Sequence, residues 1–128
     1  MVTASELRMN NLILRNGKIT KVHFTTIMDL YNKEQGVRNE YLDGLKFSGI
    51  PLTCSFIEQC AQVRKNDHIY YFTRTDMNGH ENSFNIISIV GKFICMMGLG
   101  VKEIKWVHTL QNIYYVQADE ELEFNQAS

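Results

Sequence analysis

The side chains that could do metal chemistry are scattered along this chain. Four histidines and three cysteines are present, namely His23, His68, His80, His108, Cys54, Cys60 and Cys95. A zinc site needs three or four ligands brought together, commonly with short spacings between some of them. No histidine here lies two to five residues from another histidine or from a cysteine. The spacing therefore predicts no metal site, and we expect no cofactor.

Nucleophilic catalysis would need a cysteine or serine activated by a neighbouring base. Cys95 is flanked by Ile94 and Met96, and apolar surroundings raise the pKa of a thiol by desolvation. We therefore expect Cys95 to be a buried, inert thiol, and we predict no catalytic residue and no enzymatic activity. One alternative stays open because catalytic groups assemble in space: a hidden site that uses Cys95, His108 or Glu58.

Two further motifs suggest ligands only weakly. Gly98-Leu99-Gly100 resembles a fragment of a dinucleotide-binding loop, but the third glycine and the following helix start are missing. We predict a break between strands there. Tyr70-Tyr71-Phe72 with Arg74 has the composition of a stacking platform for RNA bases. Half of an aromatic strand normally faces the core, so packing is favoured, and a weak RNA contact stays open.

The C-terminal end is acidic. Four carboxylates fall within the five residues 119–123. Charge runs of this kind are usually solvated tails. The alternative is that this acidic segment binds a basic protein surface, since lysine and arginine bind carboxylates as well as phosphates.

Length and composition predict one soluble cytoplasmic domain over residues 1–128, with an acidic tail at 119–128. The chain has 128 residues, 45% of them hydrophobic, which is enough for one packed core. Its formal net charge of −1 provides no global field toward nucleic acid or an anionic membrane. The first twelve residues lack the apolar core of a signal peptide, and the run 86–101 is too interrupted to span a membrane. Apolar neighbours around all three cysteines favour buried free thiols in a reducing compartment.

The first half of the chain is predicted to hold a hairpin, a helix and a long loop. Asn16-Gly17 between apolar runs is a strong hairpin signal, and alternation along 19–24 places Val22 and Phe24 inward. Thr25 or Thr26 caps a helix that ends near Gly36. Residues 34–50 are predicted to form a loop, with room for a short strand at 45–47, and loops of this length are often functional.

The second half predicts helices and antiparallel strands. Thr53 caps a helix whose apolar face carries Phe56, Ile57, Cys60 and Val63. Strands are expected at 69–75, 84–90 and 93–97, with a turn at Asn78-Gly79. A helix is favoured from about Val107 to Gln117, although a strand is an open alternative, and the tail could add a short edge strand. The fold class is thus α+β: a small single domain, mainly antiparallel sheet, with two or three helices packed on it.

Three segments of the sequence belong together, namely Glu6 to Leu12, Ile50 to Thr53, and Ile104 to Tyr114 followed by Asp119 to Leu122; they cover about a fifth of the chain. These segments resemble a family of small, largely uncharacterised accessory proteins of phages and mobile elements of Bacteroidetes. The family usually continues Pro-Leu-Thr with Glu-Glu-Trp and a Gly-Phe, whereas Cys54-Ser55-Phe56 stands here. The resemblance implies no catalytic residue. It implies a role against host defence, as in an anti-CRISPR protein directed at the type VI-B RNA-guided RNase.

We therefore predict a non-enzymatic inhibitor, encoded by a phage or prophage, that binds a host defence protein. The resemblance implies that the partner is an RNA-guided RNase with its guide RNA, whose guide-RNA use or RNA cleavage is blocked. Two alternatives stay open: a structural or morphogenetic phage protein that self-associates, and a weak RNA-binding module. The 34–49 loop is one expected contact surface. The single residues expected at the partner surface are Trp106, His108, Gln111, Asn112, Tyr115, Asp119, Glu120, Glu121 and Glu123.

Overall fold

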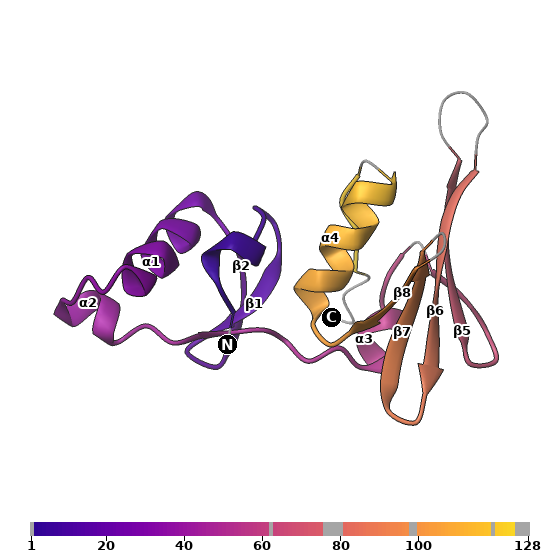
Figure 1. The fold of residues 1–128 in the computed structure, drawn as a ribbon, viewed down its shortest axis with the longest axis horizontal. Coiled ribbons are helices and arrows are strands. Elements are labelled where there is room, and N and C mark those ends of the chain that lie inside the picture. The colour runs from indigo at the N-terminus through magenta and orange to yellow at the C-terminus, as the bar shows by residue number, and fades with distance from the viewer. Residues whose placement is uncertain (1, 62, 76–80, 98–99, 119, 125–128) are drawn as a thin grey trace. The chain divides into compact units, whose positions relative to one another are not determined.

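The structure, a computed structural model, describes residues 2–61, 63–75, 81–97, 100–118 and 120–124. The α+β prediction is confirmed: the described residues form four α-helices and eight strands in two antiparallel sheets (Figure 1). The chain divides into two compact units, which are described separately. Unit 1 is Met1–Pro51 with Trp106–His108, and unit 2 is Leu52–Lys105 with Thr109–Ser128. The sequence predicted a single domain over residues 1–128, and this remains a prediction although the chain divides into two units.

Unit 1 combines a small sheet with two helices. Its three strands lie in the order β2-β1-β3, and both pairings are antiparallel. Its elements are the 3-10 helix Ala4–Glu6, β1 Leu12–Arg15, β2 Lys18–Lys21, α1 Phe24–Glu34, α2 Glu40–Asp43 and β3 Phe47–Ser48.

The hairpin predicted at Asn16-Gly17 is confirmed. Arg15 pairs with Lys18, so the loop has two residues. Asn16 and Gly17 have φ angles of +51° and +81°, which is the left-handed pair that a type I′ turn requires. Val22 is fully buried as predicted, but the inward orientation of Phe24 is wrong: its side chain is 65% exposed. The reason is that α1 begins at Phe24, which ends the alternation of the strand.

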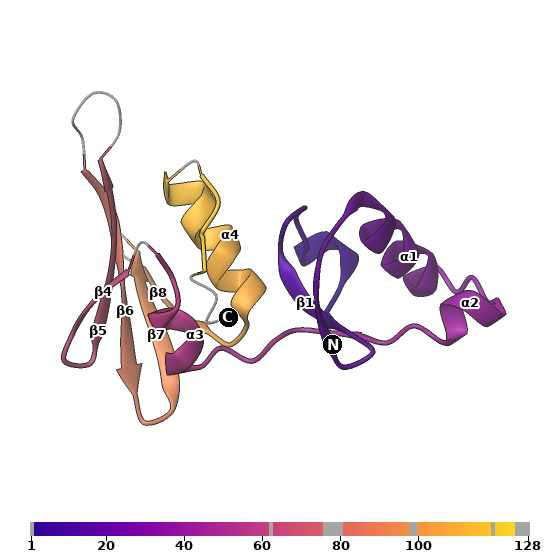
Figure 2. The ribbon, with the colours of Figure 1, turned by 180° about the vertical axis from the view of Figure 1, so that it is seen from behind.

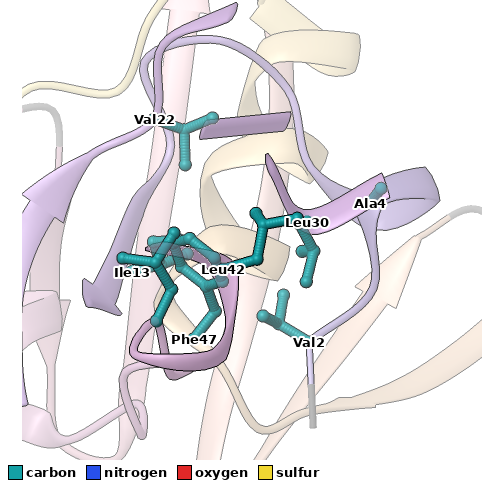
Figure 3. Close-up of a cluster of buried hydrophobic side chains, with 8 residues drawn as sticks. Val2, Ala4, Ile13, Val22, Leu30, Leu42 and Phe47 are labelled. Carbon is teal, nitrogen blue, oxygen red and sulfur yellow. The ribbon is translucent and has the colours of Figure 1, made fainter. Parts of the chain in front are cut away.

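The core of unit 1 lies between α1, the sheet and the N-terminal segment. Figure 3 shows the side chains of Ile13, Leu30 and Phe47 in this cluster, together with Val2 from the N-terminal segment and Leu42 from α2. These residues come from five separate stretches of the sequence, so the cluster can form only when the whole unit folds. Its side chains carry no polar atom, and their burial supplies the main stabilising free energy of the unit.

A helix interrupts the stretch predicted as a loop at 34–50. Asn39 caps α2, since its Oδ1 accepts a hydrogen bond from the backbone N–H of Leu42 at 2.8 Å. The Nζ of Lys33 in α1 donates to the carbonyl of Leu42 at 2.8 Å, and the Tyr41 hydroxyl donates to Asp29 Oδ2 at 2.8 Å. Two side-chain bonds thus hold this single-turn helix against α1. The short strand expected at 45–47 lies at Phe47–Ser48.

Unit 2 contains a five-stranded antiparallel meander in the order β4-β5-β6-β7-β8. Its elements are α3 Cys54–Glu58, β4 Val63–Asn66, β5 Ile69–Thr75, β6 Glu81–Ile89, β7 Lys92–Met97, β8 Gly100–Ile104 and α4 Val107–Ala118, of which the first two residues belong to unit 1. The strands predicted at 69–75, 84–90 and 93–97 are confirmed as β5, β6 and β7.

The helix predicted after Pro51 is shorter than its apolar pattern suggested. Thr53 caps α3 as expected, and its Oγ1 accepts from the backbone N–H of Phe56 at 3.2 Å. The placement of Cys60 and Val63 on this helix is wrong, because α3 ends at Glu58, Cys60 forms an isolated bridge with Phe124, and Val63 begins β4.

One face of the sheet in unit 2 is covered by α4, whose prediction from Val107 is confirmed. Figures 1 and 2 both show this helix lying along a single face of the meander. Tyr114 packs edge-on against Phe72 and Phe84, with ring centroids 6.2 Å apart in both pairs. Phe72 and Phe84 stack on each other at 4.9 Å. We call this covered side the inner face of the sheet.

The loop between β6 and β7 has two residues, Val90 and Gly91, because Ile89 pairs with Lys92. Their φ angles are +48° and +76°, so this turn also requires left-handed backbone. Gly91 adopts such a conformation freely, whereas a β-branched residue does so only with strain.

Several predictions fall at or beyond the limits of the described residues. The turn at Asn78-Gly79 and the break at Gly98-Leu99 lie outside them. In the tail, residues 120–124 contribute a single bridge between Cys60 and Phe124 and no strand, so the predicted edge strand is not found there. Among the helices in the described part of the chain, none has the length and apolar character that crossing a membrane requires.

Candidate functional site

The three residues proposed for a hidden catalytic site lie in different surroundings. Cys95 is fully buried in β7, and desolvation raises the pKa of its thiol, an effect only partly opposed by Lys102. Glu58 is held by a surface ion pair with Lys65, with 2.9 Å between Oε1 and Nζ. His108 is 2% exposed and belongs to unit 1, whereas Cys95 and Glu58 belong to unit 2.

His108 is the most unusual of these residues because neither ring nitrogen has a hydrogen-bond partner in the described part of the chain. The nearest carboxylate oxygen recorded for it, Oε1 of Glu6, is 4.0 Å from Nε2, which is beyond hydrogen-bond distance. Desolvation lowers the pKa of His108, and the Glu6 carboxylate raises it to a smaller extent. The ring is therefore favoured in its neutral form.

The cysteines differ more than their similar neighbours suggested. Burial raises the pKa of Cys60 to about 12, and Cys95 is buried as expected. The expectation is wrong for Cys54, which is exposed at the start of α3. In the described ranges, no three His, Cys, Asp or Glu side chains gather as a metal site would require.

The residues predicted at the partner surface are distributed over both units. Trp106 and Tyr115 are about one-third exposed, at 36% and 37%. His108 and Gln111 are buried, so a partner cannot reach their side chains in this structure. Asp119 lies outside the described residues, and the remaining members are half-buried or exposed: Asn112, Glu120, Glu121 and Glu123. Trp106 and His108 belong to unit 1 and the others to unit 2.

The aromatic run proposed as an RNA platform contributes mainly to the core. Tyr70 and Phe72 are each 1% exposed on the inner face of the sheet. Tyr71 points to the opposite face and is half-buried, and the side chain of Arg74 lies outside the described set. Only one of the three aromatic rings is therefore accessible for stacking.

A pocket of about 510 Å³ lies in unit 1. That volume is within the usual range for ligand-binding clefts. Its lining combines α1 with the segment predicted to be a functional loop, and consists of Leu30, Lys33, Glu34, Val37, Arg38, Asp43, Leu45, Lys46 and Phe47. The apolar members Leu30, Leu45 and Phe47 also belong to the packed core, so the pocket has a firm apolar floor.

Charged side chains surround this floor, and most of them are already engaged. The Nε of Arg38 lies 2.9 Å from Asp43 Oδ1, and this carboxylate raises the pKa of the guanidinium. Glu34 Oε1 accepts from the backbone N–H of Ala4 at 2.8 Å. Lys33 donates to the Leu42 carbonyl, as described above. Three cations and two carboxylates give the lining a net charge of +1.

Lys46 is the cation in the lining whose side chain has no recorded partner within the described residues. Its backbone is nevertheless fixed: the Asn16 N–H donates to the Lys46 carbonyl, and the Lys46 N–H donates to Asn16 Oδ1, both at 2.8 Å. The β1–β2 turn thus fixes the backbone of Lys46 at the pocket.

No family model, curated protein or solved structure matches this chain. The resemblance to accessory proteins of phages and mobile elements therefore stays a prediction.

The segment predicted as a functional loop supplies most of the pocket lining, but the chemistry of the pocket was not predicted. The length and polarity of the 34–50 stretch pointed to a functional loop, and seven of the nine lining residues fall within it. The convergence of Lys33 and Lys46 depends on the pairing of β1 with β3, because that pairing returns the chain to the hairpin. No local pattern in the sequence signals such a pairing.

Proposed function

We propose that this protein is a non-enzymatic binding protein that captures a segment of another protein in the pocket of unit 1. The observation that carries this proposal is the combination, in one pocket, of an apolar floor and a cation, Lys46, that has no ion-pair partner among the described residues. Protein-recognition sites commonly pair a buried apolar anchor with a charged rim that sets orientation.

The chemistry of the lining defines the segment that would fit. Leu30, Leu45 and Phe47 favour an apolar side chain at the bottom of the pocket. Lys46 favours a carboxylate next to that anchor, and the net positive lining disfavours a basic segment. We therefore propose a ligand segment in which a large apolar residue is adjacent to an aspartate, a glutamate or a C-terminal carboxylate.

The finer proposal concerns which protein carries this segment. On the resemblance described above, we propose a host defence protein, specifically the type VI-B RNA-guided RNase with its guide RNA, whose guide use or RNA cleavage would be inhibited. The half-buried and exposed residues of the predicted partner surface, Tyr115 foremost, would then add contacts from unit 2.

Co-purification of the full chain with this effector, followed by an RNA-cleavage assay, tests the proposal. Lys46→Glu places a carboxylate where the ligand carboxylate would bind, and we expect it to weaken binding by about tenfold or more. Lys18→Glu is the matched control, since it makes the same change at an exposed lysine outside the pocket lining. Equal binding by both variants would contradict the pocket, and no complex with wild-type protein would contradict this choice of partner.

One observation favours RNA as a second candidate ligand. Arg15 and Lys18 lie directly opposite each other at the β1–β2 turn, and like charges in this position are unfavourable for folding alone. A phosphate would relieve their repulsion. This alternative would be supported if the protein bound single-stranded RNA, if that binding fell steeply with salt, and if Lys18→Glu abolished it. Lys46→Glu therefore tests the protein segment as ligand, and Lys18→Glu tests RNA.

A further inference from the structure

The uncovered face of the five-stranded sheet in unit 2 is unusually apolar. Antiparallel sheets that expose one face to water normally alternate apolar and polar residues. In β6 and β7 four side chains on the face opposite α4 are instead large and apolar, namely Ile87, Ile89, Ile94 and Met96, while Asn85 and Lys92 are the polar residues beside them. We call this side the outer face.

The strand register arranges the outer face in cross-strand rows. In one row Asn66, Ile69, Ile87, Ile94 and Glu103 follow one another from β4 to β8. In the next row the order is Arg64, Tyr71, Asn85, Met96 and Val101. The centre of both rows is largely apolar, and the charges lie on the two edge strands.

Burial differs between the two faces at the centre of the sheet. Inner-face residues such as Tyr70, Ile86 and Cys95 are at most 1% exposed. No residue of the two outer rows is buried, and Met96 and Val101 are 49% and 68% exposed. An exposed apolar area of this kind marks an interaction surface.

The charges at the edges make this surface complementary to itself. Arg64 lies on the β4 edge and Glu103 on the β8 edge, and neither has a recorded ion-pair partner among the described residues. A two-fold symmetric interface needs a patch that matches a rotated copy of itself. Opposite charges on opposite edges of one apolar patch satisfy that requirement.

We infer that the outer face binds the outer face of a second copy of this chain, forming a symmetric sandwich of two sheets. Aligned sheets pack about 10 Å apart with their strands within roughly 30° of each other. A two-fold axis parallel to β6 places β4 of one copy over β8 of the other. Arg64 then lies near Glu103 of the second copy. The two residues belong to neighbouring rows, so they are offset by about 7 Å in the strand direction. An axis perpendicular to the strands would instead place β4 over β4 and β8 over β8, which keeps Arg64 apart from Glu103 of the second copy.

The size of the face sets the strength of this dimer. Five strands spaced about 4.8 Å apart and about 17 Å long outline roughly 400 Å² on each copy. Stable complexes bury about 800 Å² per partner, and smaller interfaces belong to transient complexes. The dimer is therefore a weak one, whose population rises with concentration in the micromolar range and above.

Sedimentation equilibrium of the full chain from about 5 to 500 µM tests the inference. We expect the mass to rise from that of a monomer toward that of a dimer. Met96→Glu buries a carboxylate at the centre of the interface and should keep the chain monomeric throughout. Ile19→Glu is the matched control, since Ile19 is also a half-exposed strand residue, 58% exposed, but lies in unit 1; this variant should dimerise like the wild type. Circular dichroism of both variants excludes loss of folding.

A charge-reversal cycle tests the orientation. Arg64→Glu and Glu103→Arg should each weaken association several-fold, and the double variant should recover it, because the ion pair is restored with its signs exchanged. A wild-type monomer at 500 µM, or a Met96→Glu dimer, would overturn the inference. A double variant weaker than both single variants would overturn the β4-over-β8 arrangement. None of these changes touches the pocket, so the result is independent of the proposed function.

Discussion

Gly49 leaves room for the indole of Trp106. A Cβ built on Gly49 would lie 2.9 Å from Cε3 of that ring and 3.1 Å from Cε1 of His108. The backbone at position 49 therefore approaches two side chains that lie far along the chain. Any larger residue at this position must push them apart.

Gly49→Ala should therefore lower the free energy of unfolding by about 1–3 kcal/mol, the usual cost of overpacking. Gly44→Ala is the control, since a Cβ at Gly44 meets ordinary contacts of 3.6 Å or more and the backbone φ there is −83°. Urea denaturation of both variants measures the difference. Equal stability of Gly49→Ala and wild type would show that the Trp106 indole moves at no cost.

His108 should make folding sensitive to acid. Because desolvation lowers its pKa in the folded protein, the unfolded chain binds the proton more readily. Its contribution to stability is complete above the ordinary histidine pKa of about 6.5 and is lost as the pH falls below that value toward the lower folded pKa. We expect the free energy of unfolding to decline between pH 7 and pH 5.

His108→Leu should remove that part of the decline, because no proton can then bind at position 108. His68→Leu is the control: His68 is an exposed histidine, and its replacement should leave the decline intact. Urea denaturation at a series of pH values measures both. If the free energy of unfolding of His108→Leu declined as much as that of the wild type, groups other than His108 would cause the acid sensitivity.

Val90 should be a site of stored backbone strain that substitution can relieve. It is 96% exposed with a φ of +48°, so its side chain contributes little packing while its backbone is unfavourable by roughly 1–2 kcal/mol. Val90→Asn reproduces the Asn-Gly pair of the β1–β2 turn and should raise the free energy of unfolding by about 1 kcal/mol. A thermal melt that shows no gain would contradict the strain.

The cysteines should react at very different rates with iodoacetamide. Cys54 is exposed, whereas Cys60 and Cys95 are buried and burial raises the pKa of both thiols. Since the thiolate is the reactive form, only Cys54 should be labelled rapidly in the native protein at pH 8. Mass spectrometry of labelled peptides identifies the site, and denaturant should expose the other two. Rapid labelling of Cys95 in the native protein would contradict its burial and would support the alternative of a catalytic site that uses this thiol.

Local signals in the sequence predicted the elements that depend on local physics. Asn16-Gly17 predicts a turn because few other residue pairs accept left-handed backbone at both positions. Thr53 marks a helix start through its own hydroxyl, and the period of Val107 to Gln117 predicts α4. The turn between the strands predicted at 84–90 and 93–97 was expected at residues 91–92 and lies one residue earlier, at Val90-Gly91, because the left-handed valine carries no such signal.

Features that depend on distant partners were missed. β4 has a single apolar residue, Val63, and it forms because its backbone pairs with the edge of β5. Phe24 continues the strand alternation in the sequence, yet helix α1 begins there. His108 was expected at a surface and is buried beside Gly49. The candidate pocket was predicted as a segment, but the approach of Lys46 to the β1–β2 turn arises from tertiary pairing.

The contribution of Trp106–His108 to unit 1 has a consequence for how this protein can be dissected. Unit 1 is discontinuous in the chain, since residues from position 106 onward complete what the first fifty-one residues begin. A truncated product ending at Pro51 would lack the indole for which Gly49 makes space. Gene fragments that cut between the two units will therefore yield an incomplete module, whereas single substitutions in the intact chain can separate the roles of the two halves.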